Sequence, residues 1–189
     1  MKQPKPERVG FLDIESTNLV ADFGFMLTWA IKDGSSKKVL HDEISLRDLR
    51  RAKAGDEDKR IVASLIQAMV GFDRIVTFYG KRFDVPFIRT RADAMGLWFP
   101  DPESIYHTDA YDTVRHRYRL SSNRLENACR VLLGRTAKTR IEAKFWRGAS
   151  RGDNHSIKEV LKHNLFDVLD LEKLFNKVKK HSKLKKSRL

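Results

Sequence analysis

Three strand-like segments in hairpin order come before a regular alternation of helix-like and strand-like segments, and this order restricts the fold more than any other feature. The first three strands are expected over residues 8–14, 23–33 and 37–46, and Asp33-Gly34 gives a hairpin turn between the last two. Two further short strands are expected over 74–79 and 104–110. Hairpins followed by alternating helices and strands predict an α/β domain with a mixed sheet. A helix-turn-helix fold fits poorly because at least five segments have strand character.

The helical segments carry the capping residues expected at helix ends. Asp56 is the predicted N-cap of the first helix, Asp84 of the second, and Asn123 and Ser156 begin two capping-box patterns. The intervening stretch 135–154 is polar and basic, and it is predicted to be a long loop. Helices are therefore expected over 61–70, 84–96, 111–118, 123–134 and 156–179.

A strong positive charge is the first indication of function. The 189 residues include 38 Lys and Arg against 25 Asp and Glu, a net charge of +13. We assign residues 1–180 to one domain and residues 181–189 to a basic, disordered tail. A basic surface attracts polyanions and favours nucleic acid as a partner, although a solvated basic face would give the same composition.

The remaining composition places the chain inside the cell. The N-terminus has no apolar signal-peptide core, and no stretch is long and apolar enough to cross a membrane, so we expect no membrane association. The single Cys129 lies in an apolar helical stretch and is predicted to be buried and inert. These features predict a cytoplasmic protein.

Two acids at the end of the first strand are the clearest candidate site. In the stretch Gly10–Thr17, Asp13 and Glu15 are separated by one residue and therefore point to the same side of a strand. Two close carboxylates repel each other unless a cation lies between them, and hard divalent cations prefer oxygen ligands. The pair indicates a metal site, but a solvated strand end explains it equally well.

Two further acids occur on helices. Asp84 follows the fourth strand at the start of a helix, where it could act as an N-cap or as an oriented metal ligand. Asp167 borders the apolar stripe of the last helix, with His163 four residues earlier on the same side. Each residue alone is also explained as an ordinary capping or boundary residue.

Taken in order, the stretches Phe11–Thr17, Val76–Ile88 and His163–Val168 resemble the three motifs of the DEDD exonuclease superfamily. Its members are proofreading-type 3′–5′ exonucleases on a ribonuclease-H-like, three-layer α/β fold. The resemblance extends from Val9 to about Phe175 and is closest to a compact, predicted-exonuclease branch whose third motif reads Tyr-Asn-x-x-Asp-Val. In this chain His163 replaces the Tyr of that motif.

The resemblance implies the active-site roles. Asp13, Glu15, Asp84 and Asp167 would hold two Mg²⁺ or Mn²⁺ ions, and His163 would be the general base that takes a proton from the attacking water. His163 stands in the Tyr frame, one residue from the usual position of a histidine base. For this reason His155 is a second candidate for the base.

The resemblance also implies the substrate contacts. Ser16, Thr17 and Asn18 would hold the terminal nucleotide, and Phe83 would stack on a base or pack in the core. Arg124 and the 135–154 stretch would contact the backbone, with candidates Lys138, Arg140, Lys144 and Trp146.

The implied function is a 3′–5′ exonuclease acting on DNA or RNA, with single strands or 3′ ends favoured. A polymerase or repair protein is a compatible partner, because the chain has no polymerase domain of its own. Two alternatives stay open: a structure-selective or RNA–DNA hybrid endonuclease on the same fold, and a non-catalytic nucleic-acid-binding module.

Overall fold

The computed structural model describes residues 6–101, 103–135, 141–182 and 189, and it contains a five-stranded mixed sheet with strand order β3-β2-β1-β4-β5. Strands β1, β2 and β3 are antiparallel, whereas β4 and β5 run parallel to β1. The strands are β1 (Val9–Ser16), β2 (Met26–Asp33), β3 (Val39–Glu43), β4 (Arg74–Thr77) and β5 (Tyr106–Asp109). Five strands in this order confirm the predicted α/β class with a mixed sheet.

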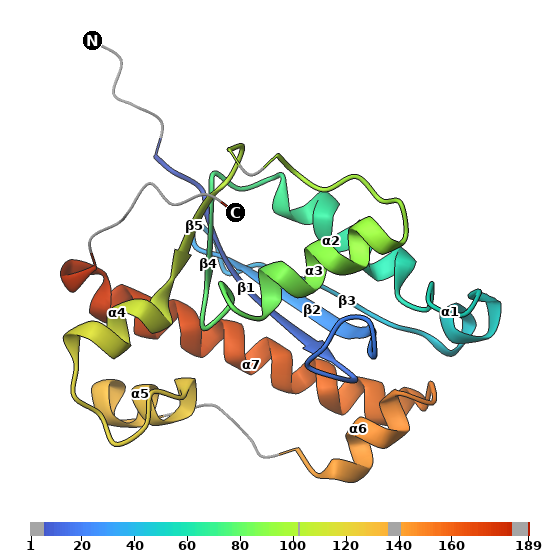
Figure 1. Cartoon of the computed structure of the whole chain (residues 1–189). Helices are drawn as coiled ribbons and strands as arrows, with labels where there is room; N and C mark the ends of the chain where they lie inside the picture. The colour runs from blue at the N-terminus through green and yellow to red at the C-terminus, as the bar shows by residue number, and fades with distance from the viewer. Residues whose placement is uncertain (1–5, 102, 136–140, 183–188) are drawn as a thin grey trace.

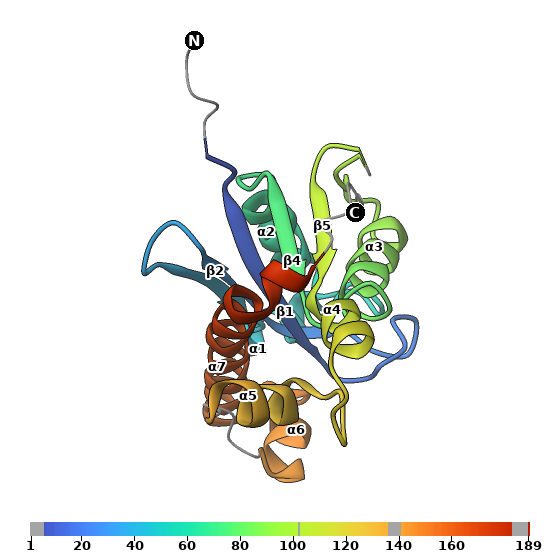
Figure 2. The same ribbon diagram turned by 90° about the vertical axis from the view of Figure 1, so that its left-hand side faces the viewer.

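Helices cover both faces of the sheet and give three layers (Figure 1). The long helix α7 (Asn154–Val178) packs across β1 and β2 on one face, and α4, α5 and α6 pack against α7. Helices α2 and α3 lie on the other side, as the turned view also shows (Figure 2). The other helices are α1 (Leu46–Arg51), α2 (Lys59–Met69), α3 (Asp84–Ala94), α4 (Ala110–Arg117), α5 (Leu125–Leu133) and α6 (Ala143–Ala149).

Strand β2, which lies between β3 and the central strand β1, is buried at every position because helices cover both of its faces. The largest core cluster joins β1 and β2 to α2 and α3, through fully buried residues such as Leu12, Ile31, Leu65 and Ile88. A rigid sheet centre therefore supports the carboxyl end of β1, where Asp13 and Glu15 lie.

Two helices were not predicted. Helix α1 begins at Leu46, where we expected the third strand to continue, and Ser45 with Asp48 forms its capping box. Helix α6 lies within the stretch 135–154 that we expected to be a loop. Both helices are only six or seven residues long, so their apolar periodicity is too short to recognise.

Several predicted caps are wrong, because side chains in folded proteins make tertiary contacts as well as local ones. Helix α2 begins after Asp58 rather than Asp56, and Asp58 is fully buried against other elements. Asp84 is the first helical residue of α3, not its cap. Helix α5 begins after Arg124, without a side-chain capping bond. Asp153 caps α7 by accepting a hydrogen bond from the backbone N–H of Ser156.

Cys129 is buried, as predicted. Most of the expected tail, residues 183–188, lies outside the described residues. Within the described part of the chain, no helix combines the length and the apolar character needed to span a membrane.

Candidate active site

The three parallel strands β1, β4 and β5 end at the same edge of the sheet, and the predicted acids gather there. Asp13 and Glu15 are on β1, Asp84 begins the helix that follows β4, and Asp167 is in the middle of α7. The carboxyl ends of neighbouring parallel strands are a frequent location of binding sites in α/β proteins.

Asp13 is at the centre of this group. Burial raises the pKa of its carboxyl well above the ordinary value, and the charges of Glu15, Asp84 and Asp167 raise it further. The side-chain amide of Asn164 donates a hydrogen bond of 2.6 Å to Asp13 Oδ2, and this bond opposes the rise. All four predicted carboxylates are therefore close enough to interact electrostatically through Asp13.

Asp84 is held directly against β1. It is 3% exposed, and its Oδ1 accepts a 3.1 Å hydrogen bond from the backbone N–H of Ile14. Burial raises the pKa of Asp84 to about 7, although hydrogen bonds from the backbone N–H groups of Asp84 and Ile14 favour its charged form. A carboxyl this strongly perturbed by burial and by neighbouring acids is typical of functional sites.

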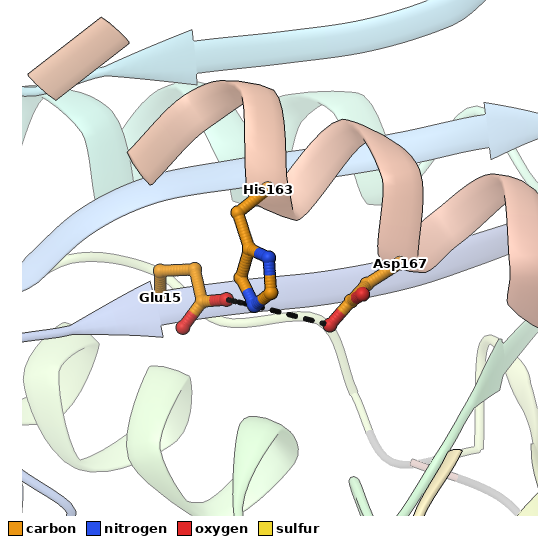
Figure 3. A group of neighbouring side chains, drawn as sticks. All are labelled: Glu15, His163 and Asp167. Carbon is orange, nitrogen blue, oxygen red and sulfur yellow. Dashed lines mark ion pairs between the residues drawn. The ribbon is translucent and has the colours of Figure 1, made fainter. Parts of the chain in front are cut away.

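His163 lies between two of the acids (Figure 3). Its Nε2 is 3.8 Å from Glu15 Oε1 and 3.8 Å from Asp167 Oδ2. One ligand atom from each of the three residues lies within 4.8 Å of the others, which is a spacing that one cation can bridge. The replacement of Tyr by His in the third motif therefore places an imidazole inside the carboxylate cluster.

The donor set suits a hard divalent cation. Carboxylate oxygens are the ligands that Mg²⁺ and Mn²⁺ prefer, and a single imidazole is compatible with Mn²⁺. The mutual repulsion that raises the pKa of Asp13 is the energetic cost that bound cations would remove.

A cavity of about 560 Å³ opens beside the cluster. Its lining includes two acids, Asp13 and Asp167, together with aromatic, polar, basic and aliphatic residues: Phe78, Tyr79, Tyr111, Asn123, Arg124 and Leu125. A cavity that is lined by acids, aromatic rings and Arg124 has the chemical character of a nucleotide-binding site.

The three small polar residues after β1 organise the β1–β2 loop. Ser16 Oγ donates to the carbonyl of Asn18, and Thr17 Oγ1 accepts from the backbone N–H of Phe25. Asn18 Oδ1 in turn accepts from the backbone N–H of Val20. These side chains hold the loop next to the carboxylates.

The other predicted contact residues divide into two groups. Arg124 lines the cavity with Asp13 and Asp167, whereas Phe83 is partly buried and packs against Phe87 with ring centroids 5.6 Å apart. Lys144 pairs with Glu142, Trp146 packs against the main core, and the His155 ring contacts Phe145. Lys138 and Arg140 lie outside the described residues.

Sequence reasoning missed several residues at this edge, above all Asp109 at the end of β5. Asp109 is 5% exposed, and its charge contributes to the raised pKa of Asp84. Asp109 lies at the end of a short strand, and Asp13 lies near the end of the predicted first strand, so the same sequence signal could have identified Asp109. Asn164, Tyr79 and Tyr111 carried no such signal because their roles depend on contacts between distant segments.

Comparison with known proteins agrees with this architecture. In the solved structure of the family B DNA polymerase from the hyperthermophilic archaeon Pyrobaculum calidifontis, a region is similar to this chain with a TM-score of 0.73 and 19% sequence identity. The match covers 92% of this chain and 25% of the polymerase chain, so this chain spans about a quarter of that protein. At this identity the likeness establishes the fold alone. No curated protein sequence matches the chain.

A sequence model of the RNase H superfamily matches residues 10–179. The match includes every element from β1 to α7 and all the acids of the cluster. The chain therefore belongs to the RNase H superfamily.

Proposed function

We propose that this protein is a metal-dependent nuclease of the DEDD type that hydrolyses phosphodiester bonds from 3′ ends of DNA or RNA. One observation carries the proposal: the charges of Glu15, Asp84 and Asp167, which come from three different elements, all raise the pKa of Asp13. Placing four acids at one site opposes folding unless bound cations offset their repulsion and desolvation, so the cluster is best explained as a metal site.

Asp13, Glu15, Asp84 and Asp167 would hold the metal ions, which we infer to be two Mg²⁺ or Mn²⁺. When bound, such a pair supplies Lewis-acid activation of water and stabilises the attacking and leaving oxygens of the phosphodiester. Four carboxylates balance the charge of two dications. Asn164 would fix the orientation of the Asp13 carboxylate, and Ile14 N–H that of Asp84.

His163 is the proposed general base. Imidazole is the side chain that most often serves as a general base in enzymes. The spacing of Glu15, His163 and Asp167 gives it a second candidate role as a metal ligand. The two roles predict different effects of His163→Ala on metal binding, as described in the Discussion.

The nucleic-acid substrate is inferred from charge and from the cavity. The chain carries a net charge of +13, which favours binding of a polyanion. Arg124 lines the cavity, and among the described residues the only acids in the cavity lining are the proposed metal ligands Asp13 and Asp167. We propose that Arg124 contacts the phosphate backbone and that Ser16, Thr17 and Asn18 position the terminal nucleotide, with a single-stranded 3′ end as the preferred form.

Digestion of end-labelled oligonucleotides tests the proposal. With Mn²⁺, a 5′-labelled single strand should give a ladder that shortens progressively, while a 3′-labelled strand should release a labelled mononucleotide first. A circular single strand should resist digestion. Cleavage of the circle would instead indicate an endonuclease on the same fold, and nucleic-acid binding without any metal-dependent cleavage would indicate a non-catalytic binding module.

A further inference from the structure

The turn after β4 contains an unusual backbone conformation beside the cavity. Tyr79 has φ = 71°, and among the described residues it is the only non-glycine residue with a positive φ. This left-handed conformation costs a large side chain about 1–3 kcal/mol and persists only where the surrounding structure imposes it. Strained residues of this kind concentrate at functional sites.

A single carboxylate holds this turn in place. Asp109 Oδ1 accepts a 2.7 Å hydrogen bond from the backbone N–H of Tyr79 and a 3.0 Å bond from that of Tyr111. Asp109 Oδ2 accepts a 3.1 Å bond from the N–H of Lys81. The same buried side chain thus fixes both segments that carry the tyrosines, the turn after β4 and the first turn of α4.

Close packing restricts the turn further. A Cβ at Gly80 would lie 2.4 Å from Oγ1 and Cβ of Thr77, so only glycine allows the chain to fold back on the end of β4. The backbone of this turn is therefore closely packed at Gly80 and held in an unfavourable conformation at Tyr79.

The two tyrosine rings form a compact aromatic group. The ring centroids of Tyr79 and Tyr111 are 5.0 Å apart at an interplanar angle of 81°, and Phe78 contacts the Tyr111 ring at 5.7 Å. The guanidinium of Arg82 lies 5.6 Å from the Tyr79 ring centroid and 5.8 Å from that of Tyr111. These contacts fix the ring orientations before any ligand binds.

This aromatic group faces the proposed reaction site. Tyr79 and Tyr111 line the same 560 Å³ cavity as Asp13 and Asp167. Tyr79 remains 44% exposed, although the turn that carries it is tightly held. An exposed aromatic ring on a rigid, strained support is suited to contact a planar ligand.

We propose that the exposed Tyr79 ring, supported by its edge-to-face contact with Tyr111, is a stacking platform for an unpaired base of the bound strand, with Asp109 as the positioning residue. This inference rests on the proposed nuclease function and specifies its substrate class: strands whose terminal nucleotides are unpaired and retain their bases. Stacking tolerates every base because each has a π face, and it is worth about 1–3 kcal/mol per base. Inside a duplex both faces of a base are covered by neighbouring pairs, whereas an unpaired base can turn its face toward the ring.

Two variants and two ring-retaining controls test the platform. Tyr79→Asn removes the ring with a residue that tolerates positive φ, and Tyr111→Leu removes the second ring. Tyr79→Phe and Tyr111→Phe keep the rings, and Trp98→Ala removes a 67% exposed aromatic residue that lines a different hollow. The substrates are a single strand with intact bases and the same strand with abasic 3′-terminal nucleotides.

Wild type and the three controls should prefer the intact strand in kcat/KM with Mn²⁺ by roughly 5- to 150-fold, the equivalent of one stacked base. Tyr79→Asn should lose most of this preference, because its kcat/KM should fall for the intact strand and stay unchanged for the abasic strand. In EDTA, the fluorescence of a 3′-terminal 2-aminopurine should be quenched by wild type and recover in Tyr79→Asn and Tyr111→Leu.

An unchanged preference for the intact strand and unchanged quenching in both ring-deleted variants would overturn the platform, even if wild type is an active nuclease. Absence of Mn²⁺-dependent cleavage by wild type would overturn the proposed nuclease function instead. The quenching measurement needs no cleavage, so the two failures are distinguishable.

Discussion

The side chain of Asn164 joins the last helix to the first strand by donating a 2.6 Å hydrogen bond to Asp13 Oδ2. Asn164 is fully buried, and its Oδ1 accepts a 3.2 Å bond from the hydroxyl of Thr28 on β2. One amide therefore connects α7 to two strands at the carboxylate cluster. Its hydrogen bond to Oδ2 also fixes the orientation of the Asp13 carboxylate, and with it the position of Oδ1.

Asn164→Ala should weaken both the fold and metal binding. Loss of the two hydrogen bonds leaves partly buried Asp13 and fully buried Thr28 without these partners and should cost about 1–3 kcal/mol of unfolding free energy. Mn²⁺ affinity measured by calorimetry should fall by about 10- to 100-fold, as for other residues that orient a metal ligand. Asn176→Ala, on an exposed position of the same helix, is the control. Equal Mn²⁺ affinity in wild type and Asn164→Ala would contradict this role.

The metal-free protein should lose stability as the pH rises from about 6.5 to 8. Burial raises the pKa of Asp84 to about 7 and that of Asp13 well above its ordinary value, so the folded state binds protons that the unfolded state has released. This stabilisation is complete below the unfolded pKa near 4 and disappears as the pH passes 7. Asp33 and Asp48 have lowered pKa values, so their contribution is lost only under more acidic conditions.

Thermal unfolding in EDTA across this pH range measures the effect. Asp84→Asn should flatten the profile, whereas Asp93→Asn, at an exposed position on the same helix, should not. Mn²⁺ should raise the Tm more at pH 8 than at pH 5, because it binds the ionised cluster. Burial lowers the pKa of His107 to about 4, so this residue adds stability as the pH rises to about 6.5 and then has no further effect. A Tm that rises between pH 6.5 and 8 in EDTA would therefore contradict the assignment of the raised pKa values.

His163→Ala separates the two candidate roles of the imidazole. Loss of a general base should reduce kcat by about 10²- to 10⁴-fold, with Mn²⁺ binding retained. This is the expected result. A loss of Mn²⁺ affinity similar to that of Asp167→Asn would assign His163 to the metal ligands, and His155→Ala serves as the control for the second candidate base.

Arg91→Met should destabilise the fold strongly. The Arg91 guanidinium contacts the fully buried Asp58 at 2.6 Å and donates to the carbonyl of Ala21, while Asp58 accepts from the backbone N–H of Met26. Removing the cation leaves Asp58 buried without its charge partner, at a cost of about 3–5 kcal/mol. Arg89→Met, two residues earlier and more exposed, is the control in urea unfolding. Losses of similar size in the two variants would argue against the importance of the buried pair.

The sequence was sufficient to predict the sheet, because its signals are local, and local signals also made the four acids candidates, which the resemblance to the DEDD motifs joined into one set. The apolar run before Asp13, the Asp33-Gly34 turn and the apolar stripe beside Asp167 each depend on neighbouring residues only. The structure brings these acids together at the edge where parallel strands end. Their roles as metal ligands stay a prediction.

Other features depend on partners far along the chain and could not be predicted in this way. Asp58 rather than Asp56 precedes α2, where it meets Arg91, 33 residues later. Asn164 bonds to Asp13 across 151 positions. The conformation of Tyr79 depends on Asp109, 30 residues later. In each case the sequence shows the residue type, and only the fold shows the contact.

Mn²⁺ dependence of cleavage in wild type and Asp13→Asn tests the central claim most directly. The charges of all three other acids raise the pKa of Asp13, so Asp13 lies close enough to interact with each of them. Its neutral variant should fold and bind a single strand but lose metal-dependent hydrolysis by several orders of magnitude. In EDTA the variant should also unfold at a temperature equal to or above that of wild type, because one source of repulsion is removed. The account predicts a 3′-to-5′ ladder from wild type with Mn²⁺ and intact strand from Asp13→Asn. Cleavage at the wild-type rate by Asp13→Asn would contradict it.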